Sequence, residues 1–320
     1  MSDLPIKLVQ LYLPLVGYVV LGWFLGCFLP KHLPPTLGKF LFWVGVPISI
    51  LAFVRRADLS GSIWIAPLFA WAAILLGAAI ARAFIALEVY RARVTSPTVV
   101  PPLESKPTQG SFLLASMVGN TGYLGYPVIL ALVDQQYFGW ALFYDLLGTL
   151  FGAYGLGVAI AARFGSNQSD RPHLALTMLA NPALWSFALA LASRDFPLPA
   201  PIELGLQKAA WTTIALSLVL IGMRLSQLSS WRGLPHVWIS LAIKMLLVPL
   251  ILGYALQFLG LNGATRLVIV LQMAMPPAFA NLILGETFHL DRDLSVAALA
   301  IGSIGFLFML PLWLWLFANG

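Results

Sequence analysis

The sequence predicts an all-α integral membrane protein. We expect ten transmembrane helices, arranged as two inverted five-helix repeats with broken crossing helices 4 and 9. Of the 320 residues, 60% are hydrophobic and only 9% are charged, whereas soluble domains carry about a quarter charged residues. Ten apolar runs of roughly bilayer-spanning length follow one another along the chain. The fourth and ninth runs contain helix breakers at matching depths, which indicates an internal repeat.

Charged, proline-rich or glycine-rich stretches separate the apolar runs. A mean hydropathy of +0.89 leaves little room beyond spans and short connections, so no separate water-soluble catalytic or binding domain fits. The longest polar stretch, 88–108, is rich in proline and charge, and we expect it to be a loop. The expected spans cover residues 8–29, 36–54, 62–87, 109–133, 138–162, 173–193, 203–223, 237–259, 264–286 and 294–317.

Five runs precede the short polar stretch at mid-chain and five follow it. We therefore expect a first repeat at 1–163, a connecting loop at 164–172 and a second repeat at 173–320, together forming one membrane domain. Because five is odd, the second repeat would enter the membrane in the opposite orientation. Many secondary transporters are built on this plan.

The net charge of +6 indicates sidedness in a membrane rather than a nucleic-acid partner. Most of the 18 basic residues fall in loops on the side of the first connection between spans. Loops rich in Lys and Arg stay in the cytoplasm. Both termini are therefore expected on the non-cytoplasmic side of the inner (plasma) membrane.

The fourth and ninth runs carry breakers that an ordinary transmembrane helix does not tolerate. The fourth contains the sequence GNTGYLGYP at 119–127, and the ninth contains QMAMPPAFAN at 272–281. Unwound backbone at membrane depth is tolerated only where it is buried in protein or lines a wet cavity. The breaks are therefore expected to meet near the bilayer centre in an inverted pair.

Each break creates a second half-helix whose N-terminus has unpaired N–H groups and the positive end of a helix dipole. Two such ends aimed at one point would bind a small organic anion, most simply a carboxylate, without any basic side chain. Neutral polar side chains could add donors there. The expected substrate-binding residues are Asn120, Tyr123, Pro127, Gln272, Pro276, Pro277 and Asn281. The alternative is that these breakers are kinks used only for helix packing.

These motifs resemble the auxin efflux carrier family in its short bacterial form, which belongs to the bile acid/auxin carrier superfamily. The two runs at 119–127 and 272–281, the pair Asn181-Pro182, the sequence KMLLVP at 244–249 and Pro47 carry the resemblance over most of the chain. On the residues of this sequence, Asn120 and Pro127 match the first break and Pro276 matches the second.

The resemblance implies a fold and a mode of action. It implies a scaffold of the first, second, sixth and seventh spans, a mobile part that works as an elevator, a homodimer, and organic anions such as indole-acetate-like or dicarboxylate compounds as substrates. Plant members have a proline where this chain has Asn281, and they carry a long central hydrophilic loop that is absent here. The first difference argues against auxin itself as the substrate.

Ionisable residues inside the spans need an explanation, since each costs about 3 kcal/mol or more in the apolar core. Asp145, some seven residues into the fifth span, is a possible proton carrier; it could instead be a hydrated acid or a partner of Lys208. Lys244 and Lys208 are expected to extend their ammonium groups toward span ends. Asp134 and Glu286 are expected to be solvated charges at span ends.

Motifs of other function classes are absent from the sequence. It has no phosphate-binding loop for ATP, no histidine pair with metal-ligand spacing and only one cysteine, Cys27, so we expect no cofactor, no metal and no enzyme activity. The leading expectation is a secondary active transporter that alternates access to an anion site. A sodium-coupled bile-acid-type symporter is one alternative, and a non-transporting membrane receptor or an intramembrane enzyme is another.

Overall fold

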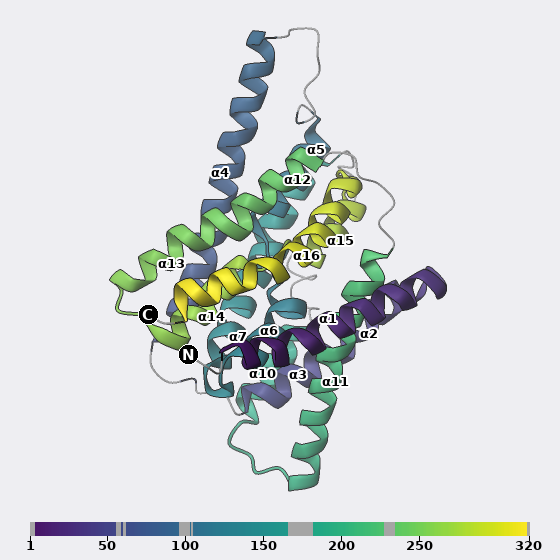
Figure 1. Ribbon diagram of the computed structural model, residues 1–320, viewed down its shortest axis with the longest axis vertical. Coiled ribbons are helices and arrows are strands. Elements are labelled where there is room, and N and C mark those ends of the chain that lie inside the picture. The colour runs from purple at the N-terminus through teal and green to yellow at the C-terminus, as the bar shows by residue number, and fades with distance from the viewer. Residues whose placement is uncertain are drawn as a thin grey trace. The chain divides into compact units, whose positions relative to one another are not determined.

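The computed structural model describes residues 4–55, 59, 62–95, 103, 105–165, 182–226 and 234–318 (Figure 1). Over these ranges the chain is helical, with one isolated β-bridge and no strand. Asn181, most of the expected connecting loop at 164–172 and the first residues of the expected second repeat lie outside the described ranges.

Within the described ranges, six helices are long and apolar enough to cross a membrane. Shorter apolar helices accompany them at Val16–Phe28, Thr121–Leu132, Pro182–Ala192 and Gly263–Ala274. The prediction of an all-helical membrane protein is confirmed at this level, whereas the count of ten spans and the inverted repeat stay predictions. The six long helices are Leu33–Val54, Ile65–Ala92, Gln135–Phe164, Ala200–Leu225, Pro235–Phe258 and Arg292–Phe317.

The chain forms two compact units, each assembled from three separate stretches. Unit 1 takes its residues from 1–61, 122–142 and 181–229, and unit 2 takes its residues from 62–121, 143–180 and 230–320. The α-helices of unit 1 are α1 (Leu4–Phe28), α2 (Leu33–Phe40), α3 (Val46–Val54), α6 (Tyr126–Leu132), α7 (Phe138–Phe143), α10 (Pro182–Ala192) and α11 (Ala200–Leu225). Those of unit 2 are α4 (Ile65–Thr95), α5 (Lys106–Met117), α8 (Val158–Phe164), α12 (Leu234–Leu241), α13 (Val248–Phe258), α14 (Gly263–Ala274), α15 (Phe279–Thr287) and α16 (Arg292–Phe317).

Glycines allow α1 and α11 of unit 1 to pack backbone to backbone. A methyl group on Gly22 would lie 2.9 Å from the Cα of Val219, and one on Gly26 would lie 2.8 Å from the Cα of Met223. A methyl group on Gly222 would in turn lie 2.9 Å from the Cα of Gly22. Because lipid offers no hydrophobic drive between helices, such close approach through small residues is a main source of helix association in membranes.

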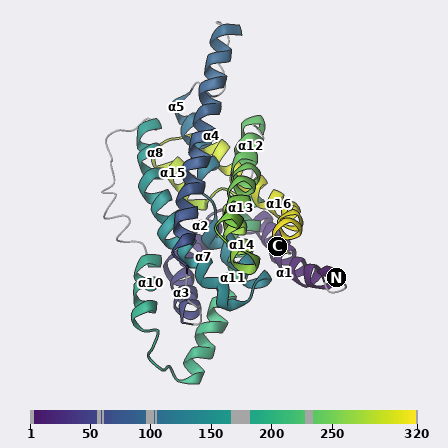
Figure 2. The ribbon, with the colours of Figure 1, turned by 90° about the vertical axis from the view of Figure 1, so that its left-hand side faces the viewer.

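A second contact in unit 1 joins the C-terminal ends of α3 and α10, which lie side by side in both views (Figure 2). The guanidinium group of Arg55, directly after α3, donates to the carbonyl oxygens of Ser193 and Phe196 beyond α10. Carbonyls at a helix C-terminus lack partners inside their helix, so a cation is favoured there.

In unit 2, the described part of the fifth expected span is less regular than the sequence indicated. The α-helix is replaced by π-helical segments at Tyr144–Thr149 and Gly152–Gly157. Gly148 and Gly152 lie in these segments, and methyl groups on them would overlap side-chain atoms of Ala70 and Ile74 on α4. The wider turns therefore accompany a close approach of two helices, which periodicity alone does not show.

Helix α4 also differs from the expectation, because it continues to Thr95 although a loop was predicted from residue 88 (Figure 1). The loop prediction is wrong over 88–95. Tyr90 and Val94 are exposed on this extension. Charged residues suit a helix outside the apolar layer, and the first proline of the polar stretch comes only at Pro97.

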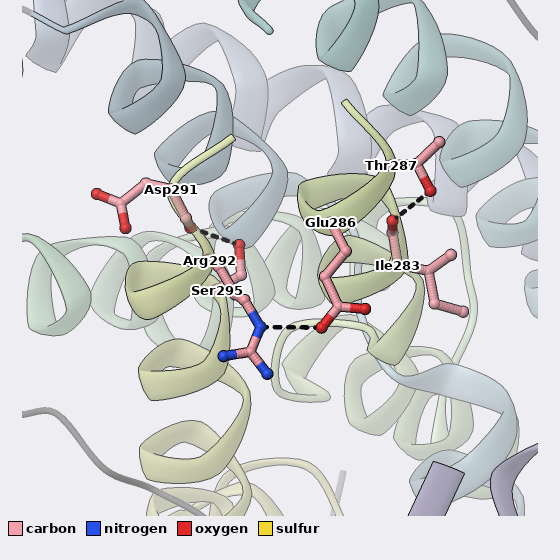
Figure 3. A network of polar contacts seen from close by, with 6 residues as sticks. All are labelled: Ile283, Glu286, Thr287, Asp291, Arg292 and Ser295. Atoms are coloured by element: carbon pink, nitrogen blue, oxygen red, sulfur yellow. Dashed lines mark hydrogen bonds and ion pairs between the residues drawn. The ribbon is translucent and has the colours of Figure 1, made fainter. Parts of the chain in front are cut away.

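The connection between α15 and α16 carries a polar network (Figure 3). Asp291 caps α16 by accepting from the Leu294 amide at 3.0 Å, and it also accepts from the Thr108 hydroxyl of α5 at 2.9 Å. Nearby, Arg292 forms an exposed ion pair with Glu286 at 2.9 Å. The network fastens the N-terminal end of α5 to that of α16, and Glu286 is the exposed end charge that the sequence predicted.

The glycine contact in unit 1 can be tested with matched substitutions in α11. Gly222→Ala is expected to lower the free energy of unfolding by about 1 to 3 kcal/mol, because the added methyl group overlaps the backbone of α1. Gly205→Ala is the control, since nothing lies within 4 Å of a methyl group there. Thermal unfolding in detergent measures both, and equal midpoints for the two variants would contradict the contact.

Candidate functional site at two interrupted helices

Two helices of unit 2 end abruptly where the sequence places its breakers. Helix α5 ends at Met117, and Val118 is already extended, with φ −104° and ψ 120°. Helix α14 ends at Ala274, and α15 begins at Phe279 after an extended Ala278. Both α5 and α14 are 12 residues long. The unwound backbone therefore follows two helices of equal length.

The two unwound segments pair with each other through their main chains. The Asn120 amide donates to the Pro276 carbonyl at 2.7 Å, and the Ala278 amide donates to the Val118 carbonyl at 2.9 Å. Gly119 and Pro277 face each other as an isolated antiparallel bridge. We call Val118–Asn120 and Pro276–Ala278 together the paired break.

The prolines reduce the number of donors that the paired break has to satisfy. Pro276 and Pro277 carry no N–H group, so only the amides around them need acceptors. The Met275 amide reaches the Gln272 carbonyl at 3.4 Å, and the Ala278 amide reaches Val118 as described above. Within this short stretch the helix breakers thus leave few backbone groups exposed to an apolar environment.

Asn281, in the first turn of α15, connects that helix to α5. Its Nδ2 donates to the carbonyl oxygens of Leu114 at 3.0 Å and Val118 at 3.3 Å. Its Oδ1 is buried and has no hydrogen-bond partner among the described residues. The amide therefore uses its donors on the protein and keeps its acceptor available.

The other predicted polar residues of unit 2 lie at or beside the paired break. Asn120 is 4% exposed, and its side chain takes no part in the main-chain pairing. Gln272 is fully buried in the last turn of α14. Thr121 follows Asn120 directly, and its hydroxyl donates to Oδ1 of Asp145 in the π-helical segment Tyr144–Thr149. Asp145 itself is half-buried.

Tyr123 and Pro127 belong to unit 1. Tyr123 is half-buried in the π-helical segment Thr121–Gly125, and Pro127 is buried at the second position of α6. Proline is tolerated there, because the first turn of a helix has no use for its amide hydrogen.

Lys244 is a site residue that the sequence analysis placed wrongly. We expected its ammonium group to extend to a span end, but the residue is 2% exposed and its Nζ donates to the Met273 carbonyl at 2.5 Å. A methyl group on Gly119 would lie 3.1 Å from this Nζ and 3.3 Å from the Met275 carbonyl oxygen. Glycine at position 119 leaves room for the lysine, whereas a methyl group there would make these contacts tight.

One signal in the sequence pointed to this position. Lys244 lies about seven residues inside an apolar run, which corresponds to roughly 10 Å of helix, and it precedes Pro249. The chain around it is π-helical at Ala242–Leu247. The side chain of a lysine this far from the start of a span can either extend its ammonium group to the membrane surface or donate to carbonyl groups inside the protein. The structure shows the second outcome.

The comparison with known families matches the chain over residues 7–314 to a model described as membrane transport protein, that of the auxin efflux carriers. The chain belongs to this family. The expected resemblance is therefore confirmed, and with it a role in membrane transport.

Archaeal relatives of this family match over long stretches. An uncharacterized transporter of Methanothermobacter thermautotrophicus is 29% identical over 311 residues, which cover 95% of this chain and 94% of the relative. An uncharacterized transporter of Methanocaldococcus jannaschii is 27% identical over 215 residues, covering 66% and 69% respectively. The uncharacterized transporter YfdV of Escherichia coli is 33% identical over 73 residues, or 23% of each chain.

The bonds of Asn281 to α5 generate a testable expectation. Asn281→Leu keeps the approximate volume but removes both hydrogen bonds, so we expect unfolding to become easier by about 1 to 3 kcal/mol. Thr287→Val is the control in the same helix, since its hydroxyl bonds only to the Ile283 carbonyl at an exposed position. A melting midpoint of the Leu variant as high as that of the Val variant would show that Asn281 does not hold α15 to α5.

Proposed function

We propose that this member of the auxin efflux carrier family is a secondary active transporter of a small organic anion, most simply a carboxylate. The proposed substrate site lies at the paired break, with Asn120, Gln272, Pro276, Pro277 and Asn281 around it. The predicted roles of Tyr123 and Pro127 are part of the same proposal.

The observation that carries this proposal is the uncapped N-terminus of α15. No side chain caps this helix, because its N-cap is Ala278. The Asn281 amide reaches the Ala278 carbonyl at 3.1 Å, and the helix dipole makes this end of α15 positive. Deep in an apolar environment such an end calls for an anion more strongly than it would in water.

Two neighbouring groups refine the chemistry of the proposed ligand. The Lys244 ammonium group adds a full positive charge beside the paired break, so backbone dipoles are supplemented by a basic side chain. The buried Oδ1 of Asn281 accepts nothing from the described part of the chain. A carboxylate that also carries a hydroxyl or N–H donor would satisfy both groups.

The make-up of the two units supports an elevator as the transport mechanism. Unit 1 collects α1, α2 with α3, α10 and α11, which are the described parts of the first, second, sixth and seventh expected spans, and it also holds α6 and α7 from the fourth and fifth. In our proposal unit 1 is the scaffold, and unit 2 carries the site across the membrane. The proposal includes ten spans in two inverted repeats at 1–163 and 173–320, a homodimer, and an inner-membrane location with both termini outside the cytoplasm.

Asp145 is the proposed coupling residue. The Thr121 hydroxyl donates to its carboxylate, and Thr121 follows Asn120 of the paired break directly. A proton that binds Asp145 changes an acceptor-only group into one that can also donate, which alters the bond at Thr121. Proton binding and substrate binding would thereby be coupled through two adjacent residues.

Uptake into sealed liposomes tests the transport proposal. We expect malate, a carboxylate that carries a hydroxyl group, to accumulate inside liposomes containing the protein, and to raise its thermal midpoint in detergent as a bound ligand does. Asn120→Ala should weaken apparent affinity by about 5- to 150-fold, the equivalent of about 1 to 3 kcal/mol. The exposed Asn262→Ala at the start of α14 is the control and should leave affinity unchanged.

The liposome experiment also separates the function classes. Ligand-induced stabilisation without accumulation would identify a receptor, and chemical conversion of the ligand would identify an enzyme. Neither accumulation nor stabilisation by any carboxylate of a broad panel would contradict an anion site.

The coupling proposal is tested by the pH dependence of uptake. Asp145→Asn retains an oxygen that can accept from the Thr121 hydroxyl, so the fold should be preserved, but it cannot bind a proton. We expect its uptake to lose the response to an imposed pH gradient. Asp134→Asn changes an exposed acid and should respond as the unaltered protein does. A normal response of the Asp145 variant would remove this residue from coupling.

A further inference from the structure

Lys244 has no counter-ion in the part of the chain that the structure describes. No carboxylate there forms an ion pair with it, and its Nζ donates to the Met273 carbonyl at 2.5 Å. The residue is nevertheless 2% exposed. A buried ammonium group without a paired carboxylate is strongly unfavourable unless other negative charge density surrounds it.

The C-terminal end of α14 supplies that charge density. Met273 lies in the last turn of this helix, which ends at Ala274. The last four carbonyl groups of a helix lack intrahelical partners, and together they form the negative end of its dipole. The Met275 carbonyl, just past the helix end, flanks the same face of Gly119 as the Lys244 ammonium group.

Carbonyl oxygens of this kind form cation sites in other transporters. In carriers with discontinuous helices, unwound carbonyls and half-helix C-termini coordinate Na⁺ or receive H⁺. In this protein the C-terminal end of α14 already binds a cation, the Lys244 ammonium group. This group is covalently attached to the segment Ala242–Leu247.

We propose that the Lys244 ammonium group is a tethered cation that fills the cation site at the carbonyl end of α14. The protonated lysine takes the place of a free monovalent ion and stabilises the unwound backbone. Because the group is covalently attached and cannot diffuse away, the paired break keeps its shape without any ion from solution.

The proposal has a consequence for coupling, and this consequence rests on the proposed function. An anion carrier with a built-in cation needs no Na⁺ to neutralise its loaded site. The proposal therefore disfavours the sodium-coupled alternative and leaves protons or the membrane potential as the driving force. The cation site itself, in contrast, is argued from Lys244 and α14 alone.

Chemical rescue of Lys244→Ala tests the proposal on the full-length purified protein without any substrate. Thermal midpoints are compared in NaCl, ethylammonium chloride and choline chloride at about 150 mM each, which keeps ionic strength constant. Lys244→Ala should melt several degrees below the unaltered protein in choline, which is too bulky for the vacated site. Na⁺ or ethylammonium should restore at least half of the loss.

Two comparisons make the rescue specific. The unaltered protein should melt at the same temperature in all three salts, because its site is full. Lys208→Ala removes an exposed lysine of α11 and should show no difference among the salts. Lys244→Ser, which also removes the charge and leaves the site open, replaces the Ala variant if that variant does not fold.

Two results would overturn the proposal. One is a Lys244→Ala variant that melts in choline at the same temperature as the unaltered protein, which would show that the ammonium group does not stabilise the backbone at this site. The other is a Lys244 variant whose midpoint is the same in choline, Na⁺ and ethylammonium. Since no substrate is present, these results are independent of whether any carboxylate is transported.

Discussion

The structure of unit 2 depends on the requirement that backbone groups find partners when no water is near. Helices α5 and α14 stop inside apolar surroundings, and each stop frees amides and carbonyls that lipid cannot satisfy. Main-chain hydrogen bonds between Val118–Asn120 and Pro276–Ala278 satisfy amides of both segments, because each segment supplies a carbonyl acceptor for an amide of the other. Gly119 permits the close approach, and the two prolines lower the number of donors involved.

This main-chain solution also arranges charge. The end of α14 is negative and holds an ammonium group, whereas the start of α15 is positive and has no side-chain cap. The two ends are only a few residues apart in the sequence, separated by Met275–Ala278. A cation and an anion can therefore be held close together without any carboxylate side chain between them. Such an arrangement suits the proposed carrier, because backbone groups keep their positions.

The sequence was sufficient for the class of protein and the location of the breaks. Breakers such as Pro276 and Pro277 act locally, so their effect is readable from the chain itself. The sequence was insufficient to place the ammonium group of Lys244. Whether this group reaches a span end or the carbonyls of α14 depends on which helix lies beside Lys244. The π-helical turns at Tyr144–Thr149 have the same origin, since they accompany the contact of Gly148 with α4. In each case the deciding partner is distant in the sequence.

The glycine contact of unit 1 limits how that unit can deform. Gly22 and Gly26 lie one turn apart on α1 and meet α11 backbone at two successive levels, at Val219 and Met223. Sliding α1 lengthwise by a single residue would bring Trp23 to the level of Gly22, where even a methyl group has no room. The two helices are thus locked in axial register. Any rearrangement during a transport cycle therefore has to move α1 and α11 together as one rigid body.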